Sequence, residues 1–346
     1  MAISDWHEIP VRDTLKDLVT RVSLRVFLGP ELCRDSEWLR ISRLYQTQSL
    51  KALRYLRLFP KILRPLVGRF SWECRQLRHV LAQTRELTDK VLQERKAARE
   101  RGVEVDNDDA LTWAEEIAEA KGIRSDAAAW QLALSTVALH TSSDLIGQAV
   151  LDLCEHPELV QPLREEIHDM MTREGRDGNN CDYSKTDIQS LRLMDSVLKE
   201  SQRLKPVSII SMGRWITEDI TLQDGTELPK DHAVAVSCHW MWDPDKYEEP
   251  AVFNGYRFYE RQIENDRLAQ LVSTSPEHLG FGHGRQACPG RYFAAHLAKV
   301  ILCHVLHNYD LKKVEEYPSK PIMYGFETNV NPMARIMIRR RTQKSG

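Results

Sequence analysis

One long apolar segment constrains the fold of this chain more than any other part of the sequence. It reads AAAWQLALSTVALHTSSDLIGQAVLDLCEH, follows the candidate N-cap residues Ser125 and Asp126, and ends before Pro157. Its first half is apolar on nearly every side, and such a helix has to be covered by other elements all round. The chain has 346 residues, 42% of them hydrophobic, which is enough to supply that cover. We therefore predict a helical domain built around a central helix at residues 125–156.

Five consecutive polar residues, HTSSD at 140–144, interrupt this helix. Polar side chains inside a buried helix need hydrogen-bond partners, which backbone, water or a ligand can supply. The interruption is therefore a candidate functional position in the middle of the helix.

The part of the chain before the central helix is also predicted to be helical. In the first hundred residues the helical pattern is broken at Pro30, Pro60 and Pro65. A polar break at residues 102–110 precedes a further helical stretch at 111–122.

A second important helix is predicted at residues 186–204, after a polar linker at 173–185. Thr186 and Gln189 have the spacing of a capping box, and the helix stops before Pro206. These signals define both ends of the predicted helix.

The pattern changes to β-type after this helix. Residues 209–215 and 232–240 read as strands, and Asp224 with Gly225 gives a turn signal between them. The last forty residues also look β-rich. The predicted fold class is therefore mainly α with small β-sheet portions.

Charge and composition argue against several classes of protein. The formal net charge is −2, which does not suit a nucleic-acid binder. No window holds about 18 consecutive apolar residues, so no membrane span is predicted, and the first residues lack the apolar core of a signal peptide. The seven cysteines are scattered without a CxxC pair, which fits a reducing compartment better than a disulfide framework or a zinc ribbon.

The most distinctive cysteine lies in HLGFGHGRQACPGRYFA, residues 278–294. Pro289 suits the first turn of a helix, so Cys288 is placed at or just before a helix N-terminus. Unpaired N–H groups and the positive end of the helix dipole favour a thiolate there. Phe281 offers an aromatic wall, and the glycines of the loop allow close approach of its backbone to a ligand.

Four readings of this cysteine are open from the loop alone. A thiolate on a flat, glycine-lined shelf suits the axial ligand of a haem iron. A buried structural cysteine is the simplest alternative. Cys288 could also be a nucleophile activated by His283, but no third group that would orient the histidine is evident. A zinc site would need more ligands nearby, and Cys303 lies deep in the next helix.

Phe281, Gly284, Cys288 and Gly290 are in register with the pattern FxxGxRxCxG. In this loop the sequence resembles the cytochrome P450 family, the haem-thiolate monooxygenases. The resemblance implies that Cys288 is the axial ligand of the iron of haem b.

The loop departs from the family pattern at Gln286, where the family has an arginine that contacts a haem propionate. The resemblance implies Arg285 or Arg214 as the substitute charge. Filamentous-fungal members of the family often show FGHG followed by a non-arginine residue, so the departure resembles a trait of that subfamily.

Glu200 and Arg203 form an ExxR pair and lie at i,i+3, close enough to touch on one face of the predicted helix. Taken alone, they read as a common surface ion pair. In the family the pair is joined by a later arginine, which the segment FNGYRF supplies here as Arg257. The resemblance implies a structural triad that clamps the long loop carrying the cysteine.

The central helix supplies the third match. The family places an acid–threonine pair in mid-helix to relay protons for oxygen activation, and this chain has His140 and Thr141 there. Histidine carries protons near neutral pH, so the substitution retains that capability. The alternative is that Thr141 bonds back to a helix carbonyl and bends the helix.

The resemblance implies one partial haem-thiolate monooxygenase domain over residues 1–346, lacking the family's N-terminal anchor and first helices. It assigns oxygen activation to the helix at 125–156, the ExxR pair to 186–204, and the haem-ligand loop with its following helix to 278–308. Substrate contacts are implied at 137–142, at 207–212 and near Phe326.

The implied reaction inserts one oxygen atom from O₂ into an apolar secondary metabolite, of terpenoid or indole-terpenoid type. Electrons would come from an NADPH-dependent reductase, docked near Arg285 and Arg291. The implied location is the surface of the endoplasmic reticulum membrane, or the cytoplasm for a chain without an anchor. The alternative is a catalytically inactive truncated fragment.

Overall fold

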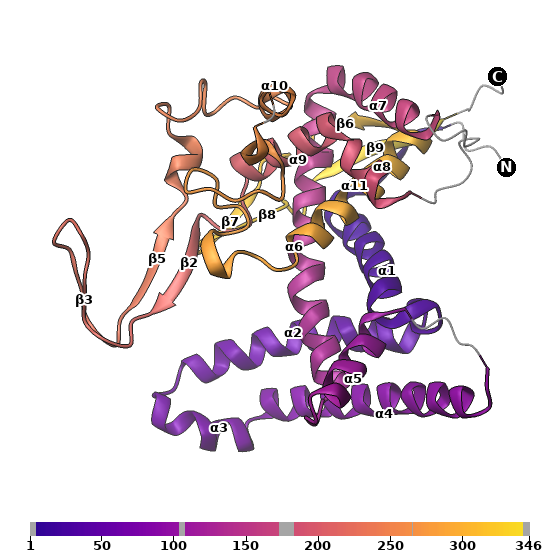
Figure 1. The fold of residues 1–346 in the computed structure, drawn as a ribbon, viewed down its shortest axis with the longest axis vertical. Coiled ribbons are helices and arrows are strands. Elements are labelled where there is room, and N and C mark those ends of the chain that lie inside the picture. The colour runs from indigo at the N-terminus through magenta and orange to yellow at the C-terminus, as the bar shows by residue number, and fades with distance from the viewer. Residues whose placement is uncertain (1–4, 104–107, 173–182, 265, 342–346) are drawn as a thin grey trace. The chain divides into compact units, whose positions relative to one another are not determined.

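The computed structural model describes residues 5–103, 108–172, 183–264 and 266–341. They form two compact units, which we call the helical unit (Asp17–His140) and the mixed unit (Met1–Lys16 with Thr141–Gly346). The unit boundaries fall inside helices α1 (Val11–Leu32) and α6 (Ala127–Glu155) (Figure 1). Most of the predicted linker at 173–185, including Cys181, lies outside the described residues.

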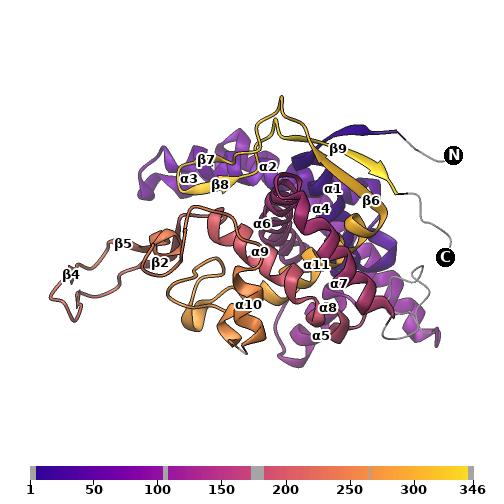
Figure 2. The same ribbon diagram turned by 90° about the horizontal axis from the view of Figure 1, so that it is seen from above.

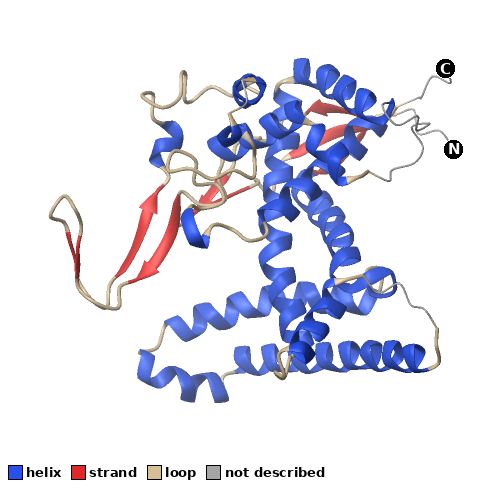
Figure 3. Cartoon of the chain, in the orientation of Figure 1, coloured by secondary structure: helices blue, strands red, loops and turns tan. Residues whose placement is uncertain are grey.

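In the helical unit, two long helices run alongside each other, α2 (Ser36–Arg57) and α4 (Trp72–Glu100) (Figure 1). Both begin at polar caps: Asp35 accepts a hydrogen bond from the Trp38 amide, and Ser71 accepts one from the Cys74 amide. Short helices η1 (Lys61–Leu63) and α3 (Arg64–Phe70) connect them, and α5 (Ala110–Ala120) follows. The described residues of this unit form helices and loops only (Figure 3).

The break predicted at Pro30 is present as a kink inside α1, at Gly29. Gly29 has a φ of 79°, and a Cβ there would lie 2.5 Å from Oδ2 of Asp109. Asp109 is buried and receives two hydrogen bonds from Arg95. Glycine is therefore needed both for the backbone conformation and for the close approach of this ion pair.

Of the two candidate N-caps of the central helix, Asp126 is the one used, because its Oδ1 accepts the Ala129 amide at 3.1 Å. The prediction that the first half is covered all round is wrong. Trp130 and Val137 are 65% and 69% exposed, on the face opposite Leu132, which packs with Ile41 and Val80. The second half is the enclosed part, since every residue at 142–154 is buried.

The helix predicted at 186–204 is two helices, α8 (Lys185–Ser190) and α9 (Arg192–Leu204), separated at Leu191. The capping box predicted at Thr186 and Gln189 is wrong. Ser184 and Asp187 form the box two residues earlier. They have the same i,i+3 spacing, and their reciprocal bonds satisfy the first amides of α8.

The strands lie in the mixed unit (Figure 3). A three-stranded antiparallel sheet has the order β1-β9-β6. Three two-stranded pairs accompany it, β2 with β5, β3 with β4, and β7 with β8. The bounds are β1 His7–Pro10, β2 Ile210–Trp215, β3 Ile220–Thr221, β4 Glu227–Leu228, β5 Ala233–Ser237, β6 Tyr309–Lys313, β7 Ile322–Tyr324, β8 Glu327–Asn329 and β9 Arg335–Arg340.

The predicted strands at 209–215 and 232–240 are confirmed as β2 and β5, and the β-rich C-terminal part is confirmed. The predicted turn is also present: Gly225 has a φ of 85° in the hairpin that joins β3 and β4. This hairpin extends beyond the ends of β2 and β5 in both views (Figures 1 and 2).

The core of the mixed unit is helical. Its buried side chains come mainly from the second half of α6, from α9 and from α11. The remaining helices are η2 Pro157–Leu159, α7 Val160–Thr172, η3 His239–Trp242, α10 Arg257–Ile263, η4 Arg267–Ala269, η5 Gly284–Gln286 and α11 Arg291–Asn308. The predicted fold class, mainly α with small sheets, is confirmed. Among the described helices, none has the length and apolar character needed to cross a membrane.

Candidate functional site

Cys288 lies in a closed loop between η5 and α11. Its amide donates to the carbonyl of Phe281 at 2.8 Å, and Gly290 is the N-cap of α11. Gly282 and Gly284 take φ values of 68° and 71° within the loop, a region that favours glycine. The thiol is therefore held just before a helix N-terminus, as the sequence predicts.

Arg291, in the first turn of α11, anchors this loop. Its Nη1 donates to the Cys288 carbonyl at 2.8 Å and its Nε to the Val272 carbonyl at 3.1 Å. Two nitrogens of Arg291 are thus used inside the protein, and its part in docking a reductase stays a prediction. Arg285 is exposed.

The segment before Cys288 lies close to three other parts of the fold. Leu279 packs in a buried cluster with Cys238 and Met241. A Cβ on Gly280 would lie 2.2 Å from Oε1 of Gln202 in α9, and a Cβ on Gly282 would lie 3.6 Å from Oγ of Ser211 in β2. The loop thus approaches both α9 and β2 closely.

The Cys288 thiol is the candidate metal donor of this loop, and a single sulfur donor suits a haem. Cys288 is partly exposed, whereas the other described cysteines are buried, and none of the six described cysteines forms a disulfide bond. Within the described residues no group of three or more His, Cys, Asp or Glu side chains could hold a metal ion. Nδ1 of His283 lies 3.4 Å from Oγ1 of Thr274, so its ring has a neighbour other than the thiol.

The loop backbone around the thiol is open at two of its glycines. A Cβ on Gly284 would meet nothing within 4 Å, and one on Gly290 would lie 4.0 Å from Sγ of Cys288. Phe281 is half-buried in the same loop. One sulfur donor with open glycine backbone around it fits the axial position of a haem.

Two arginines are available for the propionates of that group. Arg285 is exposed within the loop, and Arg214 is exposed on β2, the strand that the loop approaches at Ser211. Nη1 of Arg214 donates to the Gly213 carbonyl at 2.8 Å. Gln286, at the position where the family has arginine, is exposed as well.

The three residues of the predicted triad are in direct contact. Arg203 donates from Nε and Nη2 to the two carboxylate oxygens of Glu200, both at 2.8 Å. Nε of Arg257 donates to Oε1 of Glu200 at 3.1 Å. The side chains of Glu200 and Arg203 are 0% exposed, so the reading as a surface ion pair does not apply.

The triad also binds backbone from a distant part of the chain. Nη1 of Arg203 donates to the carbonyls of Met241 and Pro250, at 2.6 and 2.7 Å. Nη1 of Arg257 donates to the carbonyl of Glu248 at 2.7 Å. The charges therefore tie α9 to the segment 241–257, which leads towards the cysteine loop.

Lys199 is a supporting residue that the sequence predictions missed. It is 1% exposed, and its Nζ donates to the carbonyls of Leu268 and Gln270 at 2.9 and 2.7 Å. Burial lowers its pKa to about 7, opposed by the charge of Asp195. The buried ring of His278 lies against the Lys199 carbonyl, at 3.4 Å from Nε2. The only sequence signal was the position of Lys199 beside Glu200 in a charged helix.

The polar interruption of α6 has two parts, and the helix runs through it without a break. His140 and Thr141 are exposed, and their role in proton relay stays a prediction. Ser142, Ser143 and Asp144 are buried.

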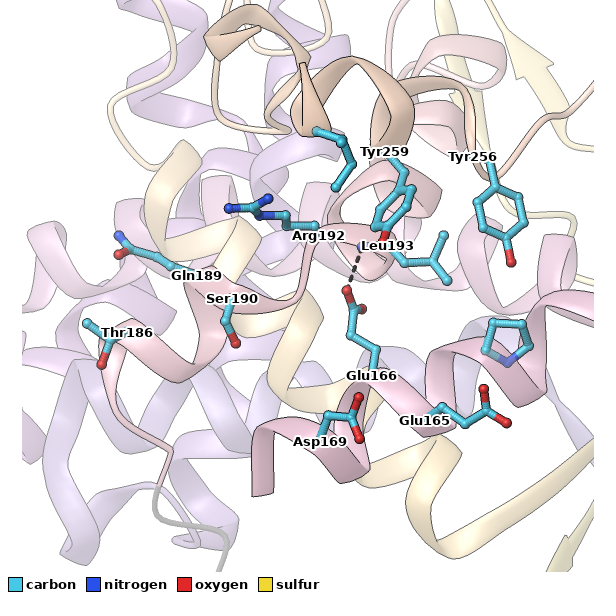
Figure 4. A pocket seen from close by; sticks show the side chains of 12 residues that line it. Glu165, Glu166, Asp169, Thr186, Gln189, Ser190, Arg192, Leu193, Tyr256 and Tyr259 are labelled. Atoms are coloured by element: carbon cyan, nitrogen blue, oxygen red, sulfur yellow. Dashed lines mark hydrogen bonds between the residues drawn. The ribbon is translucent and has the colours of Figure 1, made fainter. Parts of the chain in front are cut away.

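A separate groove of about 750 Å³ lies among α7, α8 and α10 (Figure 4). Glu166 points from α7 towards the start of α9, where its carboxylate accepts the amides of Leu193 and Met194 at 2.7 and 3.0 Å. Burial raises the pKa of this carboxyl. Glu166 thus acts as a helix cap, and none of the predicted site residues lines the groove.

Comparison with known proteins agrees with the motifs. The family model for cytochrome P450 matches residues 5–338. The chain is 43% identical to a cytochrome P450 monooxygenase 1 of Gibberella fujikuroi, over 98% of this chain and 77% of the relative. It is 43% identical to the cytochrome P450 monooxygenase adrA of Penicillium rubens (99% and 66%) and 42% identical to TRI1 of Fusarium sporotrichioides (97% and 60%).

The chain therefore belongs to the cytochrome P450 family. The predicted enzyme class is confirmed, since these relatives are fungal proteins named as monooxygenases. The chain spans about two thirds of the length of several of these relatives, between 60% and 77%. The roles of the individual site residues stay predictions.

Proposed function

We propose that the chain is the haem-thiolate part of a monooxygenase that oxidises an apolar secondary metabolite. The observation that carries this proposal is the anchored, partly exposed Cys288 at the start of α11, with no set of companion metal ligands among the described residues. The unpaired amides and dipole at the start of α11 favour the thiolate form. Haem b held there would supply the activation of O₂ for transfer of one oxygen atom.

The other residues have binding and proton-handling roles in this proposal. Arg214 or Arg285 would pair with the haem propionates, and Phe281 would supply an aromatic contact to the haem. Thr141 would hold a proton on its hydroxyl, and His140, the preceding residue in the sequence, would replenish it. Both residues are exposed. Electrons come from an NADPH-dependent reductase, with exposed Arg285 on the cysteine side as one basic contact.

A polycyclic terpenoid or indole terpenoid is the proposed substrate. The fungal sources of the relatives support a substrate from secondary metabolism. Apolar side chains at the turn between β7 and β8 support an apolar one: Met323, Tyr324 and Phe326 are 58%, 63% and 58% exposed.

The test is oxidation under ¹⁸O₂ of a terpenoid panel, with haem-loaded protein, a fungal NADPH-dependent reductase and NADPH. We expect a product carrying one ¹⁸O atom. Thr141→Val, nearly equal in size, should keep the haem but lower product per NADPH by about 10² because the proton donor is lost. A product labelled from water instead would overturn the proposal. A haem-loaded protein that oxidises no panel member would favour the inactive fragment.

We also propose that the protein lies on the surface of the endoplasmic reticulum membrane. The segment 50–72 has six basic residues and no acidic residue. We call it the basic apolar segment. Its large hydrophobic side chains are mostly exposed, with Ile62 at 86% and Leu58 at 77%. Cationic groups beside exposed apolar side chains suit an anionic lipid surface.

Vesicle sedimentation tests this location. We expect binding to vesicles containing phosphatidylserine, weakened by salt, and weaker binding to phosphatidylcholine alone. The double variant Ile62→Asp/Leu66→Asp should bind at least about tenfold more weakly, because each buried aliphatic side chain contributes about 1.5 kcal/mol or more. Ile263→Asp, at an exposed site of the mixed unit, is the matched control and should bind normally. Equal binding by both variants would refute the assignment.

A further inference from the structure

The hairpin formed by β7 and β8 is held to the rest of the mixed unit from two directions. On one side its bonds are to backbone: the Ile209 amide donates to the Phe326 carbonyl at 2.9 Å, and the Thr328 amide donates to the Val207 carbonyl at 3.0 Å. On the other side the bond is to a side chain. Oδ1 of Asp144, in α6, accepts the amide of Val330 at 2.5 Å.

The contact between α6 and Val330 is closely fitted. Val330 is 2% exposed. A Cβ on Gly147, one turn beyond Asp144, would lie 2.8 Å from Cγ2 of Val330. In α6, Gly147 therefore leaves space for the Val330 side chain. Asp144 supplies the acceptor for the Val330 amide.

We propose that Asp144 is a positioning residue that fixes the end of the β7–β8 hairpin and thereby sets the exposed apolar side chains at its turn. The hairpin has no other side-chain acceptor for Val330 among the described residues. Its turn carries Tyr324 and Phe326, which face solvent rather than the core. An effect of the hairpin position on substrate binding rests on the proposed function. The positioning of the hairpin by Asp144 does not.

The burial and hydrogen bonding of Asp144 favour a role in positioning the hairpin. The residue is 6% exposed, and its second oxygen, Oδ2, has no hydrogen-bond partner among the described residues. Burial raises the pKa of Asp144 to about 6, opposed by the Val330 amide, by the charge of Arg12 and by the buried Gln148 side chain one turn away. Burying a carboxylate costs free energy, and the amide of Val330 is the backbone donor directed to it, which favours a positioning role.

Two variants of Asp144 separate its role as a hydrogen-bond acceptor from its negative charge. Asp144→Asn keeps an oxygen that can accept the Val330 amide and removes the charge. Asp144→Ala removes the acceptor. If the hydrogen bond to the Val330 amide is what positions the hairpin, Asp144→Asn should keep the hairpin in place and Asp144→Ala should not.

Hydrogen–deuterium exchange of the purified chain, which needs neither haem nor substrate, tests the positioning directly. We expect Asp144→Ala to speed amide exchange in peptides covering 322–330 by about tenfold, the effect of losing one buried hydrogen bond. Asp144→Asn should stay within about threefold of the parent protein, and peptides covering β5 should not change. Gly147→Ala is an independent variant that displaces Val330 and should speed exchange in the same peptides.

A second readout concerns the substrate. Asp144→Ala should raise KM for the oxidised terpenoid by about tenfold with kcat within about twofold, and leave the carbon monoxide spectrum unchanged, because the Cys288 loop has anchors of its own. Unchanged exchange at 322–330 in both Asp144→Ala and Gly147→Ala would overturn the proposal. An equal increase in the amide exchange of peptides covering β5 would also overturn the proposal. If no substrate is found, the exchange result still decides the positioning, independently of the proposed function.

Discussion

Replacing Arg203 by leucine is expected to destabilise the protein by about 3–5 kcal/mol, because it leaves the fully buried carboxylate of Glu200 without its bidentate partner. The variant also leaves the Met241 and Pro250 carbonyls without their donor. Typical domains are stable by about 5–15 kcal/mol, so much of the variant should be unfolded or aggregated on expression. Urea unfolding followed by circular dichroism measures the difference. Arg203→Lys should recover only part of it, since an ammonium group lacks the planar fork.

The chain contains a matched control for this prediction. Glu37 and Arg40 form another i,i+3 pair on a helix, with a 2.6 Å contact, but their side chains are 47% and 46% exposed. Arg40→Leu should leave the unfolding midpoint essentially unchanged. If Arg203→Leu and Arg40→Leu behave alike, the triad is not the clamp inferred here.

The second large effect is expected at the thiol. Cys288→Ala should abolish specific haem retention, lowering bound iron from about one per chain to near zero, because in the proposed function the Cys288 thiolate would be the main bond between the haem and the chain. The fold should survive, since the side chain is only partly buried and the loop is closed through the Cys288 backbone. Iron analysis with circular dichroism measures both outcomes. Cys74→Ala, at a buried cysteine of the helical unit, is the control and should retain iron.

The local parts of the candidate site were predictable from the sequence. Pro289 and the loop glycines indicated a thiol just before a helix, and Gly290 caps that helix. The i,i+3 spacing of Glu200 and Arg203 indicated their contact. Bringing in Arg257 required the family resemblance, because nothing local relates residues 57 positions apart.

Most of the contacts that the sequence predictions missed join distant positions of the chain. The break at Leu191 is supported by Glu166, which caps α9 from 27 residues upstream. Lys199 reads as a surface residue until the carbonyls near Leu268 surround it. The bond from Asp144 to Val330 joins positions 186 residues apart. A charged residue on a helix has no local signal that tells burial from exposure, so such contacts follow only from the tertiary structure.

The most direct test of the central claim is the reduced carbon monoxide difference spectrum of the haem-loaded chain. A thiolate-type Soret band is expected, and Cys288→His should replace it with an imidazole-type band while iron stays bound. A band of imidazole type in the parent protein, or a thiolate-type band that persists in Cys288→Ala, would show that Cys288 is not the haem ligand.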